Sequence, residues 1–139
     1  MNVTVDISGA FIRRFSRREL ESFVIRCLRE IGGKRRYQEV SIAFVDDLEM
    51  TRLNGRFRRK QRTTDVLTFP GEHEEGSLGD IVISIDQAKR QARDERHSLP
   101  TEVRYLLVHG LIHAHGYDHE TDAGEMNSLE VKVRKRVGL

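Results

Sequence analysis

Apolar and polar residues alternate in short stretches of this chain, which is the pattern of strands with one buried face. The alternation is clearest from Val40 to Val45, and the first residues of the chain show it as well. Four stretches are predicted to be strands: 2–7, 40–45, 65–69 and 80–85. Together they predict a small four-stranded sheet.

Helical patterns lie between and after these strands. Ser16 followed by Glu19 is a capping box, so a helix is expected from Ser16 to about Ile31, before two glycines. Four further helix starts are predicted: Asp46 before a short helix with Leu48 and Leu53, Asp86 before 87–97, Thr101 after Pro100, and Asp122 before Met126, Leu129 and Val133. The order of elements predicts an α+β (mixed α/β) domain with helices packed on the sheet.

The chain has the size of one domain. Its 139 residues, of which 37% are hydrophobic, suffice for a core, and we expect a single domain over 1–139. Residues 71–77 are expected to form a loop. No apolar run is long enough to span a bilayer and the N-terminus does not resemble a signal peptide, which predicts a cytoplasmic protein. Cys27 is the single cysteine, and its helical position beside Val24 and Leu28 favours a core residue over a nucleophile.

Positive charge is concentrated in one part of the chain, although the net charge is only +2. Between Arg52 and Arg62 there are six basic residues and no acidic residue. Such a run favours polyanions, because each neutralised phosphate releases counterions and arginine can bind phosphate through two hydrogen bonds. The alternative is a solvated loop without a partner. The basic residues near the two ends of the chain are expected to be helix surface.

Three histidines have the spacing of a metal site. His109, His113 and His119 lie at positions i, i+4 and i+10. Because residues four apart lie on one face of a helix, the first two can bind the same metal ion. Gly116 can take the left-handed conformation that ends a helix, which would let the chain turn and bring His119 back. Three protein ligands leave a fourth position for water, as in catalytic zinc sites.

These histidines also have simpler interpretations. One histidine pair at helical spacing is more often a surface or core feature, but four of the six histidines lie within 109–119, which favours metal binding. His115 is expected to face another side of the helix and not to be a ligand. Asp118 could hydrogen-bond a ligand imidazole or could simply occupy the turn.

The histidine spacing matches the metzincin protease motif His-Glu-x-x-His-x-x-Gly-x-x-His, except that Gly110 replaces the glutamate base. With the segments 54–58, 64–70 and 79–84, the chain resembles the YbeY family of bacterial metal-dependent endoribonucleases, which act in ribosomal RNA maturation. The family motif His-Gly-x-Leu-His-x-x-Gly-Tyr-Asp-His is kept at every histidine, at both glycines and at Asp118. The small departures, none of which removes a ligand or a charge, are Ile112, Ala114 and Thr68.

The resemblance implies a sheet with parallel and antiparallel strands and a metal site at the end of a helix in the C-terminal half. It implies one zinc ion, or another divalent metal such as nickel, on His109, His113 and His119. It also implies a functional role for Arg58, since an arginine beside a metal can stabilise charge on a phosphodiester. Four further basic residues are expected to contact RNA: Arg56, Arg59, Lys60 and Arg62.

The implied activity is endoribonucleolytic cleavage in ribosomal RNA processing, including maturation of the 16S rRNA 3' end and ribosome quality control. The ribosome or its proteins are the expected partners, with neither DNA nor membrane. Two alternatives stay open. One is a metzincin-like metal-dependent hydrolase of another substrate, which would need a replacement for the missing base. The other is a non-catalytic, metal-stabilised ribosome assembly factor. Thr64, Asp65 and Asp80 have two possible roles: they either take part in the function or cap turns and strand ends.

Overall fold

The computed structural model describes residues 3–9, 15–33, 36–58, 65–117 and 124–139. The strands are β1 (Thr4–Ser8), β2 (Glu39–Val45), β3 (Val66–Pro70) and β4 (Ser77–Ser84). The α-helices are α1 (Arg17–Ile31), α2 (Asp47–Arg58), α3 (Ile85–Asp94), α4 (Leu99–Ala114) and α5 (Glu125–Arg136), and η2 (His73–Glu75) is a short 3-10 helix.

The four strands form one mixed sheet in the order β1-β2-β4-β3. β1 and β4 both pair with β2 in parallel, and β3 pairs with β4 antiparallel. The alternation in β2 has its expected cause, because Val40, Ile42 and Phe44 are buried while the residues between them are more exposed. The predicted fold class and the predicted mixed sheet are therefore confirmed.

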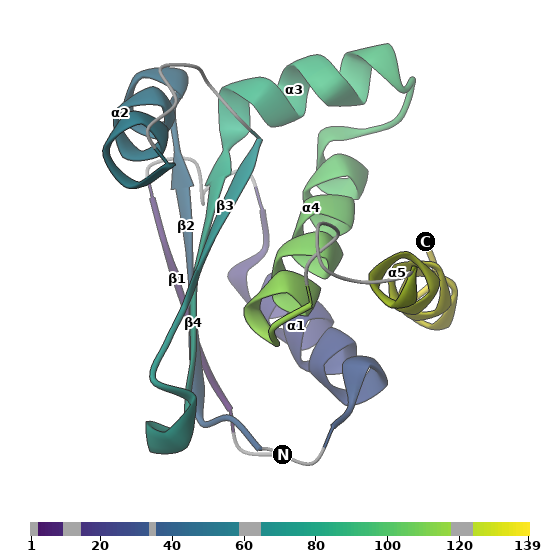
Figure 1. The fold of residues 1–139 in the computed structure, drawn as a ribbon. Coiled ribbons are helices and arrows are strands. Elements are labelled where there is room, and N and C mark those ends of the chain that lie inside the picture. Colours follow the sequence, from purple (N-terminus) through teal and green to yellow (C-terminus); the bar gives the residue numbers. More distant parts are fainter. Residues whose placement is uncertain (1–2, 10–14, 34–35, 59–64, 118–123) are drawn as a thin grey trace.

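The helices cover the two faces of the sheet unequally. Figure 1 shows α1 and α4 on one side of the sheet, with α5 outside them, and α2 on the other side. The main core lies between the sheet and α1 and α4, and includes Ile81, Val108 and Leu111. A smaller cluster of Met50, Leu67 and Val82 lies under α2. α4 is thus a central element that contacts the sheet and the helices α1, α3 and α5.

Several predicted helix signals are confirmed. Ser16 Oγ accepts a hydrogen bond from the Glu19 N–H at 3.3 Å, and α1 ends at Ile31 with Gly32 as its C-cap, which has a φ of 69°. Asp46 Oδ1 accepts from the Glu49 N–H at 2.9 Å at the start of α2. Of the two leucines predicted in that helix, Leu53 packs on the smaller cluster whereas Leu48 is 81% exposed. Asp122 lies outside the described residues, and α5 begins at Glu125.

Two predicted caps were wrong. α3 is capped by Ser84, whose Oγ accepts from the Gln87 N–H, and Asp86 lies inside the first turn. α4 begins at Leu99 with Ser98 as its cap, so Thr101 donates its N–H to that cap instead of starting the helix. α3 also ends at Asp94 and not at residue 97, because Arg96 takes a φ of 58°, which a helix cannot continue through.

The segment 71–77 is only in part the predicted loop. It contains η2, and its last residue, Ser77, already belongs to β4. β4 starts before residue 80 because Ser77 pairs with Glu39 of β2 and Gly79 pairs with Pro70 of β3. In the part of the chain that the structure describes, no helix is both long enough and apolar enough to cross a membrane.

Candidate metal and RNA site

α4 presents the first two predicted ligands side by side. His109 and His113 are four residues apart on this helix, and their ring centres lie 4.7 Å apart with an interplanar angle of 68°. Both side chains are half-buried. Two neutral imidazoles in this arrangement are a donor set suited to zinc and similar divalent ions.

Gly110 brings α4 close to the sheet between these two histidines. A Cβ atom at this position would lie 2.9 Å from Cγ2 of Ile81 and 3.5 Å from Oγ1 of Thr68. The Thr68 Oγ1 also lies 3.5 Å from the carbonyl oxygen of Gly110. The position that holds the glutamate base in the protease motif therefore faces the packed sheet, where a longer side chain does not fit without displacing α4.

The helix ends where the sequence predicted. α4 stops at Ala114, and the Gly116 N–H donates to the His113 carbonyl at 2.9 Å. Gly116 has a φ of 104°, a conformation that side-chain-bearing residues rarely adopt. The third predicted ligand, His119, lies outside the described residues together with Asp118. Within the described part of the chain, no three His, Cys, Asp or Glu side chains are grouped to hold a metal.

A buried carboxylate from α5 contacts the first ligand. Oε1 of Glu130 is hydrogen-bonded to Nδ1 of His109, and its Oε2 accepts from Nη2 of Arg134 at 2.9 Å. Glu130 is only 5% exposed, and Cζ of Arg134 lies 4.7 Å from the centre of the Tyr105 ring. Glu130 is not among the predicted site residues, and Arg134 belongs to the C-terminal basic residues that were predicted to be helix surface.

A sequence signal for Glu130 exists in the pattern of α5. Met126, Glu130 and Val133 are the three buried residues of this helix, at positions i, i+4 and i+7. An acidic residue on an apolar stripe is uncommon, because burying a carboxylate requires a partner. The pattern therefore indicates that Glu130 needs a cationic or hydrogen-bonding partner elsewhere in the fold.

The His115 side chain contacts residues other than His109 and His113, which agrees with the prediction that it faces another side of the helix. Its Nδ1 lies 2.7 Å from the Leu111 carbonyl oxygen, and its ring meets Tyr37 edge-on with a centre distance of 5.2 Å. Burial lowers the pKa of His115, with a further lowering from nearby His73. A neutral imidazole in this place can donate its Nδ1 hydrogen to the carbonyl.

A pocket of about 510 Å³ lies beside His109, between the start of β3 and helices α3, α4 and α5. Its wall includes Tyr105, Arg134 and Asp65. Asp65 also has structural contacts, since its Oδ2 accepts from Gln91 and its carbonyl accepts from the Ser84 N–H. Asp80 is exposed on β4, and Thr64 lies outside the described residues.

The predicted RNA-contacting residues lie in the last turn of α2 and in the sequence after it. Arg56 is exposed on this helix, and Arg58 is its last residue, with a side chain outside the described part. Three others lie beyond the described residues: Arg59, Lys60 and Arg62. Arg52, on the same helix, is paired with Glu49 at 2.6 Å, so its charge is balanced locally.

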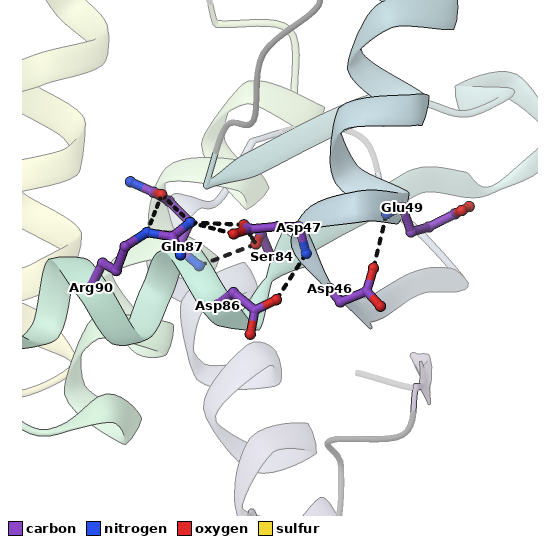
Figure 2. Close-up of polar contacts among 7 residues, drawn as sticks. All are labelled: Asp46, Asp47, Glu49, Ser84, Asp86, Gln87 and Arg90. Atoms are coloured by element: carbon purple, nitrogen blue, oxygen red, sulfur yellow. Dashed lines mark hydrogen bonds and ion pairs between the residues drawn. The ribbon is translucent and has the colours of Figure 1, made fainter.

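The start of α2 is fixed to the start of α3 by a polar cluster, shown in Figure 2. Nη2 of Arg90 contacts both carboxylate oxygens of Asp47, at 2.8 and 2.7 Å. The Asp47 N–H donates to Oδ2 of Asp86, and the buried Ser84 hydroxyl donates to Asp47. Asp86, although not the cap of α3, thus binds the first turn of α2. These contacts fix where α2, and hence the helix end at Arg58, lies on the sheet.

Comparison with known proteins identifies relatives over nearly the whole chain. The sequence profile of the family described as "Endoribonuclease YbeY" matches residues 10–138. A protein of that description from Nautilia profundicola is 44% identical over 126 residues, which cover 90% of this chain and 91% of the relative. Another, from Solibacter usitatus, is 38% identical over 138 residues, covering 99% of this chain and 88% of the relative.

The fold is also similar to a solved structure. The solution structure of a protein from Thermotoga maritima matches with a TM-score of 0.61 and 30% sequence identity. The match covers 96% of this chain and 89% of that one. The similarity therefore extends through the sheet and the helices on both of its faces.

Proposed function

Because the chain belongs to the YbeY endoribonuclease family, we propose that it is a metal-dependent endoribonuclease whose metal is held by His109, His113 and His119. The observation that carries this proposal is the approach of the His109 and His113 rings on one face of α4. Gly116 supports it as well, because its positive φ ends the helix just before the segment that contains His119.

The chemistry of the donor set fits a single zinc ion, and nickel is a second candidate. When bound at an open three-histidine site, such an ion acts as a Lewis acid towards phosphate oxygens and lowers the pKa of bound water. The chain contributes the positions of the ligands. His109 is held by Glu130, and both described ligands are held by a helix that packs tightly on the sheet at Gly110.

Arg58 is the proposed electrostatic partner of the metal. Cleavage of a phosphodiester builds negative charge on the non-bridging oxygens, and a guanidinium can stabilise that charge without transferring a proton. The polar cluster at the start of α2 supports this role, because it holds the helix that ends at Arg58. The proposed contacts to the RNA backbone come from Arg56, Arg59, Lys60 and Arg62.

The proposed substrate is ribosomal RNA, and the proposed role is its processing in the cytoplasm, including maturation of the 16S 3' end and quality control of ribosomes. The ribosome or its proteins would be the partners, with neither DNA nor a membrane involved. Support for an RNA substrate comes from family membership and from the basic run between Arg52 and Arg62. The processing role rests on the family resemblance alone.

Cleavage of ribosomal RNA fragments by purified protein of known metal content tests the proposal. We expect the wild type to cut, and His113→Ala and Arg58→Ala each to lose about 100-fold or more in rate. Arg52→Ala is the matched control for Arg58, since it removes an arginine of the same helix that is already paired with Glu49, and it should cut like the wild type.

Each of the other outcomes identifies an alternative. Equal cutting by all four proteins would mean a contaminating ribonuclease. A metal-loaded wild type that leaves RNA intact would favour the non-catalytic assembly factor. Hydrolysis of peptides with RNA left intact would favour the metzincin-like hydrolase.

A further inference from the structure

We propose that Glu130 is a positioning residue of the metal site, which orients His109 and fixes its tautomer through a buried contact between α5 and α4. The inference rests on the proposed function in one respect, namely that His109 is a metal ligand. It adds a residue that lies outside the histidine motif and 21 positions away from His109 in the chain.

The contact is built into the fold. Glu130 is 5% exposed, and its two oxygens are used separately, Oε1 for Nδ1 of His109 and Oε2 for Nη2 of Arg134. A carboxylate in such a place is stable when it is ionised and fully engaged by cationic or hydrogen-bonding partners. Arg134 supplies the charge, and it is itself held over the ring of Tyr105 at 4.7 Å.

The direction of this hydrogen bond determines which nitrogen of His109 is available. An ionised carboxylate only accepts hydrogen bonds, so the hydrogen of a neutral His109 must be on Nδ1. Nε2 then carries the lone pair, which is the form of the ring nitrogen that can bind a metal ion. Metal-binding histidines typically have this arrangement, in which the second nitrogen donates to a carboxylate that orients the ring and raises its basicity.

A second buried pair in the same fold supplies an internal comparison. Oε1 of Glu102, which is 4% exposed, lies 2.7 Å from Nε2 of His97. This pair resembles the Glu130 pair in residue type and burial, and Glu102 lies on the same helix as the predicted ligands. His97, however, is not a predicted ligand. A difference between the two pairs therefore measures the effect on the metal site and not the loss of a buried Glu–His contact.

The test is zinc affinity, measured by competition with a chromophoric chelator, together with the visible spectrum of the cobalt-substituted protein. Glu130→Gln should weaken zinc binding by about 10- to 100-fold and alter the cobalt bands, whereas Glu102→Gln should change the affinity by less than about twofold. Unfolding of the metal-free proteins, followed by circular dichroism, shows that both variants are folded. Equal affinity and equal spectra for wild type and Glu130→Gln would overturn the inference.

A measurement on the wild type avoids any variant that fails to fold. Long-range proton–nitrogen NMR of the metal-free protein, with the His109 ring in its neutral form, should show the ring hydrogen on Nδ1, and a hydrogen on Nε2 would overturn the inference. Failure of the proposed function has a different signature. If the wild type binds no zinc, that result contradicts both the metal site and this inference. Zinc binding without RNA cleavage would contradict only the nuclease proposal.

Discussion

At the scale of single residues, Gly110 restricts the chemistry that α4 can support. The protease motif places its glutamate base at this position, but here a Cβ atom would lie 2.9 Å from Cγ2 of Ile81. This atom belongs to a β-branched side chain, whose branch point cannot swing away without moving its strand. The glycine therefore allows α4 to pack closely on β4, and this packing leaves no room for a glutamate at the position of the protease base.

Gly110→Ala should destabilise the protein by about 1 kcal/mol. Overpacking of a core costs about 1–3 kcal/mol, whereas replacing a helical glycine by alanine returns only about 1 kcal/mol of helix propensity. Urea unfolding measures the difference. In an Ile81→Leu background, which removes the branch that meets the new methyl group, the same substitution should become neutral or stabilising. A stabilising Gly110→Ala in the wild-type background would contradict this account of the packing.

Cys27 should be inert in the folded protein. It is fully buried in α1, and burial raises the pKa of its thiol to about 12, so the reactive thiolate is scarce at neutral pH. We expect a thiol reagent to label the protein slowly in buffer and rapidly once denaturant unfolds it. Fast, stoichiometric labelling under native conditions would contradict the prediction that Cys27 is a core residue.

The sequence predicted local features of the site and missed the contact that depends on packing. The helical spacing of His109 and His113 and the turn at Gly116 are set by residues close together in the chain, and the structure contains both features. The contact between Glu130 and His109 depends on how α5 lies against α4. Motif spacing contains no information about that arrangement, although a buried acid on the apolar stripe of α5 indicated that some partner was needed.

At the scale of elements, the two incorrectly predicted helix N-caps show that tertiary structure decides which of several residues with similar capping propensity becomes the cap. Ser84 and Asp86 are both good N-caps, and they lie two residues apart. β4 continues to Ser84, so α3 starts directly after it and leaves Asp86 in the first turn. Asp86 is then free of the capping role and accepts the Asp47 N–H of α2 instead. Local sequence could place this helix within a few residues, but its first residue is set by the end of the strand.

Ser84→Ala should therefore cost more than the loss of an ordinary cap. The Ser84 hydroxyl caps α3, contacts Asp47 and is fully buried, whereas Ser16 caps α1 through the equivalent bond on an exposed surface. We expect about 2 kcal/mol for Ser84→Ala and about 0.5–1 kcal/mol for Ser16→Ala, measured by urea unfolding. Equal costs would mean that the buried contact to Asp47 adds nothing to the cap.

At the scale of the whole molecule, the strand order brings distant segments together. β2 and β4 are parallel neighbours, so the starts of α2 and α3 emerge at the same edge of the sheet and meet in the cluster of Asp47 and Arg90. The number of strands followed from the alternating pattern. Their order did not, because the pattern of each strand is the same whichever neighbour it pairs with.

Charge is the other property of the whole molecule that matters for function. A net charge of only +2 gives weak overall attraction to RNA, so binding must depend on local clusters. Within α2, Arg52 is paired with Glu49, and Arg56 is an exposed residue of the basic run. Removing an arginine that neutralises a phosphate should lower the number of counterions released, whereas removing one whose charge is already balanced should not.

Arg56→Ala should therefore reduce the salt dependence of RNA binding. For a single-stranded RNA, the slope of log K against log salt concentration should become shallower by about 0.7 for each lost phosphate contact. Fluorescence anisotropy over a series of salt concentrations measures this slope, and Arg52→Ala should leave it close to the wild-type value. If both variants keep the wild-type slope while binding persists, α2 does not contact the RNA backbone through Arg56. If Arg52→Ala makes the slope shallower by the same amount as Arg56→Ala, the pairing of Arg52 with Glu49 does not persist when RNA binds.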